Sequence, residues 1–348
     1  FFKKAGDKGH IESLYQYALF SINNENEENK KKAIRFFRIA AINDNIEAMN
    51  RYAVCLYKGF GIETDKEEAV KYLKKACDKG NDHAMYNYSY CLLKGEGIEK
   101  NSKEAIKNLK ILIEKENTSA INLYAQLLSN GSEIPVNKEE SVKYFKMAAD
   151  KGSTGSMCYY ALMLLKGEGV EYNKEEAFEY LNKAIEKGDK STYCIIGDVY
   201  YDGIGVEVDK KEAIKYYKIA SDKGLIERMV RYANMLYKGE GIEPNKEEAV
   251  KYFKMAADKG DDDAMNSYAQ CVLNRKESEI DINEAIKYFK MSAENENIEG
   301  MFYYGVLLLF SSNAELQKEF IHFICFRDIN SLGAIIQKSF EDESQKSL

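Results

Sequence analysis

The sequence lacks the features that mark membrane-spanning and nucleic-acid-binding proteins. Its 348 residues include no tryptophan and only two prolines. The longest apolar stretch, Met301–Phe310, is half of the roughly 20 residues that a membrane-spanning helix requires. The 50 basic and 57 acidic residues are interspersed and give a net charge of −7, whereas nucleic-acid phosphates need a clustered basic face. We expect neither membrane insertion nor a nucleic-acid partner.

The cysteines argue against a disulfide framework. Their number, seven, is odd, and Cys55, Cys91 and Cys271 fall on one position that recurs every 36 residues and elsewhere holds leucine, methionine or valine. Cysteine at such a position is expected to act as a small buried hydrophobic residue rather than as a disulfide partner or metal ligand. We therefore expect a reducing compartment, the cytoplasm, with the endoplasmic-reticulum lumen or secretion as alternatives because the chain opens without methionine.

What the sequence does contain is a repeat of 36 residues. Small residues recur at this spacing in the series Ala33, Ala69, Ala105, Ser141, Ala177, Ala213, Ala249 and Ala285. A constant period of this length indicates one supersecondary unit stacked many times, each copy burying its apolar face on its neighbours. The predicted fold is all-α, a right-handed α/α superhelical solenoid of about eight helix–turn–helix repeats.

Each repeat is predicted to hold two helices, which we name helix A and helix B. In residues 45–80, Asn45 precedes an apolar stripe at helical spacing that contains Met49, Tyr52 and Leu56, which predicts helix A. Helix A ends at a glycine, Gly59, which can take the left-handed conformation that stops a helix. Helix B follows after this A–B loop and ends near residue 80.

A recurrent acidic motif is predicted to cap helix B. An Asn or Asp recurs at the start of helix B in every copy, and a Glu follows three residues later except at Lys32; the first residues are Asn29, Asp65, Asn101, Asn137, Asn173, Asp209, Asn245 and Asp281. A short polar side chain at the N-cap accepts a backbone N–H, and Glu at the third helical position completes a capping box. We therefore expect these side chains to accept backbone N–H groups and not to bind metal.

The repeat resembles the Sel-1-like repeat, which is itself similar to the tetratricopeptide repeat. The residues that carry the resemblance are Tyr88-Ser89, Lys94-Gly95-Glu96-Gly97 and Lys103-Glu104-Ala105. The predicted organisation is the end of a preceding helix B in residues 1–9, the solenoid in 10–311, a degenerate repeat or C-terminal capping helices in 312–340, and a flexible tail in 341–348.

The resemblance implies a non-catalytic scaffold or adaptor that binds a protein or peptide partner, with helix A on the concave face. Two alternatives are a structural component of a larger cytoskeletal or ciliary assembly, and a hydrolase of the repeat family. The predicted partner-binding residues are Asn50, Arg51, Tyr86, Tyr90, Asn122, Gln126, Arg231, Asn234, Asn266 and Gln270. We expect them to be exposed, so that alanine at Arg231, Asn234 and Asn266 would weaken binding and barely change stability.

No motif indicates catalysis, a cofactor or a metal. The Gly-x-Gly loops follow predicted helices rather than strands and lack the third glycine of the dinucleotide fingerprint. His10, His83 and His322 match no metal spacing, and Asp261–Asp263 is expected to cap a helix A rather than bind calcium. We predict that no Ser, Cys or Lys lies within hydrogen-bond reach of a histidine.

Overall fold

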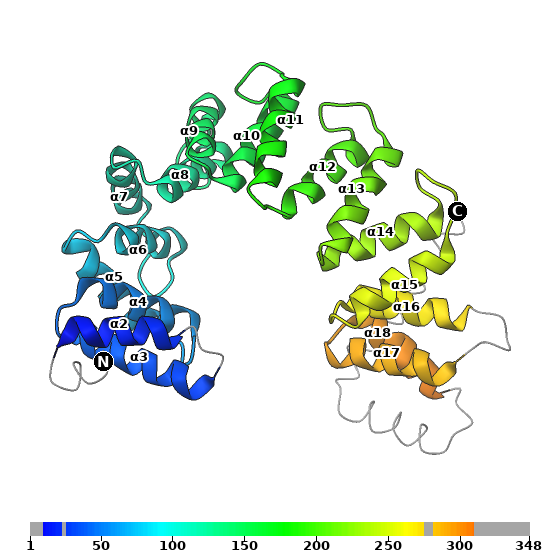
Figure 1. The fold of residues 1–348 in the computed structure, drawn as a ribbon, viewed down its shortest axis with the longest axis horizontal. Coiled ribbons are helices and arrows are strands. Elements are labelled where there is room, and N and C mark those ends of the chain that lie inside the picture. Colours follow the sequence, from blue (N-terminus) through cyan, green and yellow to red (C-terminus); the bar gives the residue numbers. More distant parts are fainter. Residues whose placement is uncertain (1–9, 23–25, 275–280, 310–348) are drawn as a thin grey trace. The chain divides into compact units, whose positions relative to one another are not determined.

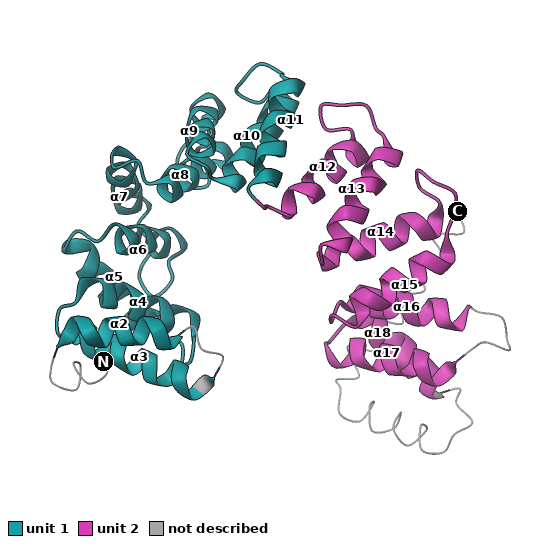
Figure 2. Cartoon of the chain, in the orientation of Figure 1, with its two compact units in different colours: residues 1–187 teal, residues 188–348 magenta. Residues whose placement is uncertain are grey.

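A computed structural model of the chain describes residues 10–22, 26–274 and 281–309 (Figure 1). These residues form 17 α-helices, and they contain no strand. The prediction of an all-α helix-pair repeat is therefore confirmed. The helices divide into two units, residues 1–187 and residues 188–348 (Figure 2). The predicted segments 1–9 and 312–348, with His322, lie outside the described residues.

Unit 1 consists of five helix pairs, in which each helix A contacts the helix B that follows it. Its A helices are α2 (Ile11–Ile22), α4 (Ile46–Lys58), α6 (Asp82–Lys94), α8 (Thr118–Asn130) and α10 (Thr154–Lys166). Its B helices are α3 (Glu27–Ile42), α5 (Lys66–Asp78), α7 (Ser102–Glu114), α9 (Lys138–Asp150) and α11 (Lys174–Glu186).

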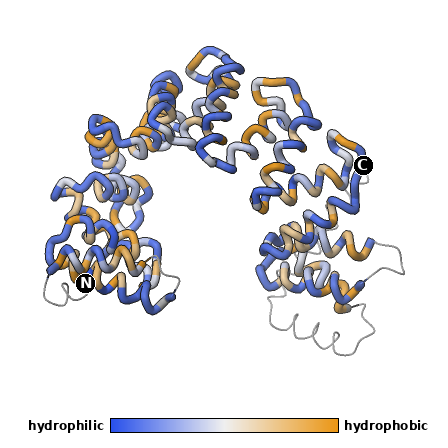
Figure 3. The backbone as a smooth tube through the Cα atoms, viewed as in Figure 1, coloured by the Kyte–Doolittle hydropathy of each residue, from blue (hydrophilic) through white to orange (hydrophobic). Residues whose placement is uncertain are grey.

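The described residues of unit 2 repeat the arrangement, and the last helix among them is an A helix. Its A helices are α12 (Ser191–Asp202), α14 (Ile226–Lys238), α16 (Asp262–Leu273) and α18 (Ile298–Leu309). Its B helices are α13 (Lys210–Asp222), α15 (Lys246–Ala257) and α17 (Ile282–Glu294). Hydrophobic and hydrophilic residues alternate along the helices of both units (Figure 3), as amphipathic helices require.

The core of each repeat contains a fully buried small residue of helix B, and five repeats add a pair of tyrosines. The recurrent alanine of helix B is completely buried, as at Ala69 and Ala249, so that helices A and B approach closely. Tyr52 of helix A meets Tyr72 of helix B edge-to-face, with ring centres 5.1 Å apart. Edge-to-face contact suits the ring quadrupoles. The same pair recurs in four other repeats, as Tyr124–Tyr144, Tyr160–Tyr180, Tyr232–Tyr252 and Tyr268–Tyr288.

The predicted helix B caps are confirmed. In seven repeats the N-cap oxygen accepts the backbone N–H three residues ahead at 2.8–3.1 Å, at Asp65, Asn101, Asn137, Asn173, Asp209, Asn245 and Asp281. Asp261 caps helix A in the same way through Ala264 N–H, at 2.8 Å. The prediction for Asn29 is wrong, because α3 begins earlier and Asn26 is its N-cap.

The capping box is only half formed. The N-cap N–H of Asn101 donates to the carbonyl of Leu92 at 3.0 Å and is therefore not free for the Glu104 carboxylate. That carboxylate instead accepts the Asn101 side-chain amide at 3.1 Å and the Tyr88 hydroxyl at 3.3 Å. The recurrent glutamate thus ties its cap to helix A.

The A–B loop packs on the preceding repeat. Its first glycine ends helix A in the left-handed region, as at Gly95 with φ 69°. Its second glycine lies against the first turn of the previous helix B: a Cβ on Gly97 would stand 2.1 Å from the carbonyl oxygen of Lys66. Only a residue without a side chain fits there.

Candidate partner-binding surfaces

Three of the predicted amides join successive A helices instead of facing solvent. Asn50 is buried, 6% exposed, and its side-chain oxygen accepts Asn87 Nδ2 at 2.9 Å. Asn266, 2% exposed, donates to Asn297 Oδ1 at 3.0 Å, and the half-buried Asn122 accepts Ser156 Oγ at 2.8 Å. The expectation that Asn50 and Asn266 are exposed is wrong, because this helix position faces the next helix A.

The other predicted residues of unit 1 keep accessible side chains. Tyr86 and Tyr90 lie one turn apart on α6; Tyr86 is half-buried, and Tyr90 is exposed with the Lys94 ammonium 5.9 Å from its ring centre. Gln126 is half-buried on α8. Arg51 is exposed and lines a surface pocket of about 360 Å³ that reaches from α4 to α2.

In unit 2, Arg231 of α14 is held between two tyrosines. Its guanidinium carbon lies 4.3 Å from the Tyr201 ring centre and 5.5 Å from that of Tyr217. Its Nε is buried without a hydrogen-bond partner. Asn234, one turn further along α14, and Gln270 at the equivalent position of α16 are half-buried. Arg231, Asn234 and Gln270 thus offer donors that no described carboxylate satisfies.

A half-buried charge cluster beside Arg231 was not predicted from the sequence. Asp198 of α12 accepts the Tyr217 hydroxyl at 2.6 Å and both terminal nitrogens of Arg228 at 3.2 Å. Burial first, then the Asp198 hydrogen bond, raises the pKa of Tyr217. A signal was present in the sequence, because Asp198 and Arg228 are 30 residues apart, the spacing of several other contacts between successive repeats.

The glutamate of the A–B loop is bound by the preceding repeat. Glu96 Oε2 accepts the Tyr57 hydroxyl at 2.5 Å and Lys66 Nζ at 2.7 Å. In unit 2, Glu240 Oε2 accepts Tyr201 at 2.7 Å and Lys210 at 2.9 Å. The lysines hold the pKa of both carboxyls below the ordinary range, with the tyrosine hydrogen bonds as the next cause. We call each set of Tyr, Lys and Glu a loop clamp.

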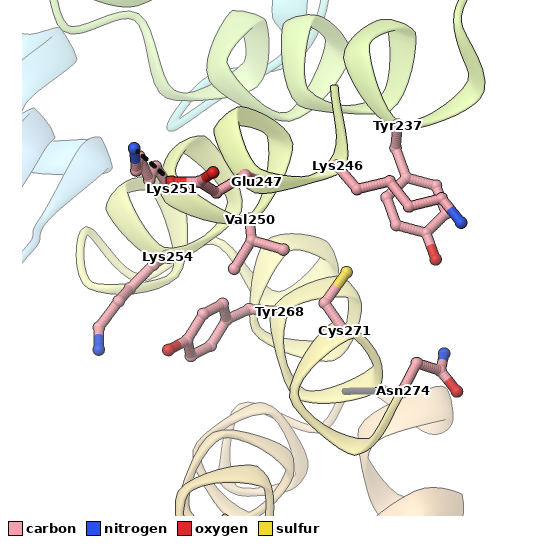
Figure 4. A pocket seen from close by; sticks show the side chains of 9 residues that line it. All are labelled: Tyr237, Lys246, Glu247, Val250, Lys251, Lys254, Tyr268, Cys271 and Asn274. Carbon is pink, nitrogen blue, oxygen red and sulfur yellow. Dashed lines mark ion pairs between the residues drawn. The ribbon is translucent and has the colours of Figure 1, made fainter. Parts of the chain in front are cut away.

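A pocket of about 710 Å³ lies where α14, α15 and α16 meet (Figure 4). Tyr237 and Lys246 lie side by side at one wall, and Tyr268 and Lys254 form another. Cys271 contributes an apolar surface between them. Lys254 is paired with Glu284 at 2.9 Å. Lys246 forms no ion pair or side-chain hydrogen bond with another described residue, and its ammonium lies 5.3 Å from the centre of the Tyr237 ring.

One expectation about catalytic groups is wrong. Ser13 Oγ lies 2.8 Å from His10 Nδ1, although no Ser was expected within reach of a histidine. The contact is local, because the same Nδ1 accepts the Ser13 backbone N–H at 3.2 Å and so caps the start of α2. No third group orients the imidazole among the described residues, as a nucleophile–base pair requires.

The remaining chemistry of the described residues is sparse. They contain no group of three or more His, Cys, Asp or Glu that could hold a metal ion. Cys55 and Cys91 are buried, and burial raises the pKa of each thiol to about 11. Such thiols are poor nucleophiles at neutral pH. Within the described segments, no helix has the length and apolarity to cross a bilayer.

The stacked helix pairs of the described residues define an α-solenoid. Repeat proteins of the Sel1 and tetratricopeptide-like kind generally mediate protein–protein interactions. The chain belongs to the Sel1 repeat family. The Sel1 repeat model matches residues 12–45, 46–81, 82–117, 118–153, 155–189, 193–225, 229–261 and 262–297. Solenoids of this family are generally non-catalytic. The sequence matches no curated protein.

Solved structures show the same fold at low sequence identity. A Sel1 repeat protein from Oxalobacter formigenes is 20% identical over 88% of this chain and 90% of its own, with a TM-score of 0.61. The protective antigen c5321 of uropathogenic Escherichia coli is 21% identical over 93% of this chain and 70% of its own, with a TM-score of 0.58. Yeast Tom70 is 17% identical over 89% of this chain and 67% of its own, with a TM-score of 0.56.

Proposed function

We propose that this chain is a non-catalytic scaffold that binds an acidic segment of a protein partner through A-helix side chains of unit 2. The observation that carries the proposal is Arg231, whose guanidinium stacks on Tyr201 at 4.3 Å and has a buried Nε without a hydrogen-bond partner. Nearby Arg228, by contrast, is paired with Asp198. A cation held in place without a carboxylate favours an acidic ligand.

The surroundings of Arg231 suit an extended peptide. Asn234 and Gln270 occupy equivalent positions of α14 and α16, and amide side chains can both donate to and accept from a peptide backbone. The tyrosine rings restrict the guanidinium, so that little further rotamer freedom is lost on binding. Arginine and tyrosine are also the residues enriched at interface hot spots.

Photo-crosslinking can test which face binds. A photoreactive amino acid placed at Asn234 or Gln270 samples helix A, and one placed at the exposed Met255 of α15 samples helix B. We expect crosslinks to a partner from the helix A positions of the full chain in its native cell. Crosslinks from the helix B position alone would contradict the proposal and favour the structural-assembly alternative.

A matched pair of arginine variants can test the chemistry. Arg51 occupies the same repeat position as Arg231 but is exposed in unit 1. Arg231→Ala should reduce the yield of the Asn234 crosslink about tenfold, the effect of losing a charge-assisted hydrogen bond, whereas Arg51→Ala should leave it unchanged. Equal loss in both variants would indicate a general charge effect. Asn266→Ala is unsuitable here because that side chain is buried.

A further inference from the structure

The described residues contain two loop clamps, which are filled copies of one carboxylate receptor, and a third Tyr–Lys pair that binds no described carboxylate. In each case a lysine in the first turn of helix B lies over a tyrosine from the last turn of helix A, with the ammonium 5.3 Å (Lys66–Tyr57), 5.0 Å (Lys210–Tyr201) and 5.3 Å (Lys246–Tyr237) from the ring centre. Glu96 and Glu240 fill the first two. No described carboxylate binds the third.

The reason lies in the sequence of the following loop. The clamping glutamate comes 30 residues after its lysine in both filled copies, and the residue at that spacing from Lys246 is Lys276. A lysine cannot replace the carboxylate as an acceptor. The glycines that flank Glu96 and Glu240 are also replaced, by Arg275 and Glu277.

We propose that Tyr237 and Lys246 form a receptor for a partner's glutamate carried on a glycine turn. The filled copies define the occupant: the Glu96 carboxylate accepts from both donors, and Gly97 lets the backbone lie against the first turn of helix B. The proposal shares with the proposed function only a protein partner as its ligand. Its site is centred on the start of α15 rather than on Arg231.

The pocket around the receptor supports this assignment. Of its three lining lysines, Lys251 and Lys254 are paired with Glu247 and Glu284. Lys246 has no carboxylate partner among the described residues, so its charge favours an anionic ligand. Val250 and Cys271 line the space beside these charges, where an aliphatic residue of the ligand can pack. In the filled loop an aliphatic residue, Ile98, follows Gly97 and packs against the core of unit 1.

The test uses a peptide copied from the filled loop, residues 94–101 of this chain (KGEGIEKN), with blocked ends, and ligand-observed NMR on the full protein. We expect the peptide to bind and its Glu96→Gln form to bind about tenfold more weakly, because a neutral amide forms no charge-assisted bond with Lys246. Equal binding of the two peptides would refute the carboxylate assignment, as would no binding of the first.

Protein variants locate the binding. Lys246→Ala and Tyr237→Phe should each weaken peptide binding, by about tenfold and about threefold, while the matched control Lys251→Ala, in the same pocket but paired with Glu247 at 3.2 Å, should not. Unchanged thermal midpoints show that the variants fold. Binding that appears only after Glu277→Gln and Glu279→Gln would show that the chain's own loop is the occupant, and would overturn the proposal. Crosslinks at Asn234 without peptide binding would overturn this proposal alone.

Discussion

Lys210 Nζ lies 2.9 Å from Glu240 Oε2, and this contact ties α13 to the A–B loop of the next repeat. The two residues are far apart in sequence but are brought together by the stacking of one repeat on another. The tie is electrostatic and partly exposed, so it adds little on its own. Its repetition nevertheless makes the stack sensitive to acid.

The first prediction concerns this acid sensitivity. The pKa of the Glu240 carboxyl is lowered in the folded chain by Lys210 and then by Tyr201. A depressed carboxyl pKa stabilises the fold above the unfolded value of about 4.3 and loses that effect as the pH falls through the folded pKa. We therefore expect Glu240→Gln to lower the thermal midpoint at pH 7, and the difference from wild type to shrink below about pH 4. A difference that is constant across this range would show that Glu240 contributes by packing.

The second prediction concerns the second glycine of the loop. Gly97→Ala should destabilise unit 1 severely, by several kcal/mol and at least ~3, because its Cβ would meet the Lys66 carbonyl oxygen at 2.1 Å. Gly80→Ala is the matched control: Gly80 also has a positive φ, 86°, but nothing lies within 4 Å of its Cβ. It should cost only the conformational strain of about 1–2 kcal/mol. Urea denaturation midpoints compare the two, and equal losses would disprove the close approach of the loop.

The third prediction concerns the helix caps. Asn137→Ala should cost about 1 kcal/mol, because Asn137 Oδ1 accepts the Glu140 backbone N–H at 3.0 Å. Asn137→Asp should retain most of the stability, since aspartate caps the same position at Asp65 and Asp209. Glu139→Ala, in the same turn but with an exposed side chain, serves as control. If it shifts the urea midpoint as much as Asn137→Ala, the effect belongs to charge near the helix end rather than to the cap.

The fold could be predicted because the same pattern of small, apolar and capping residues recurs in every repeat. One helix of 13 residues gives a weak signal, but eight copies in phase at 36 residues reveal which positions tolerate only small or apolar side chains. The same comparison identified the caps. It failed at Asn29, where Asn26 offered a cap one turn earlier; two acceptors near one helix start cannot be ranked by spacing.

The surfaces could not be predicted to the same extent. Periodicity places Asn50 and Asn266 on helix A, but their burial depends on Asn87, which extends from the neighbouring A helix, and on Asn297, which directly precedes the next A helix. The Tyr237–Lys246 pair consists of the same two residue types as its filled counterparts. It differs from them in the sequence of the loop that follows, where Lys276 replaces the glutamate. The residue at one repeat position therefore predicts a binding surface better when it is compared together with the residue 30 positions further along, which contacts it in the filled copies.

The last prediction concerns alkaline pH. Burial, and then a hydrogen bond of 2.6 Å to Asp258, raises the pKa of Tyr288 to about 12. In the unfolded chain tyrosine has a pKa of about 10. Because the pKa of Tyr288 is higher in the folded chain, its neutral hydroxyl stabilises the fold below pH 10, and this stabilisation is lost as the pH rises to about 12. Tyr288→Phe removes both the hydrogen bond and this titration, so its urea midpoint should lie below that of wild type at pH 8 and approach it as the pH rises above about 10. Tyr90→Phe, on the exposed face of α6, should follow wild type throughout. If the Tyr288→Phe midpoint runs parallel to wild type across this range, the Asp258 contact does not control the ionisation, and packing alone accounts for the cost of the variant.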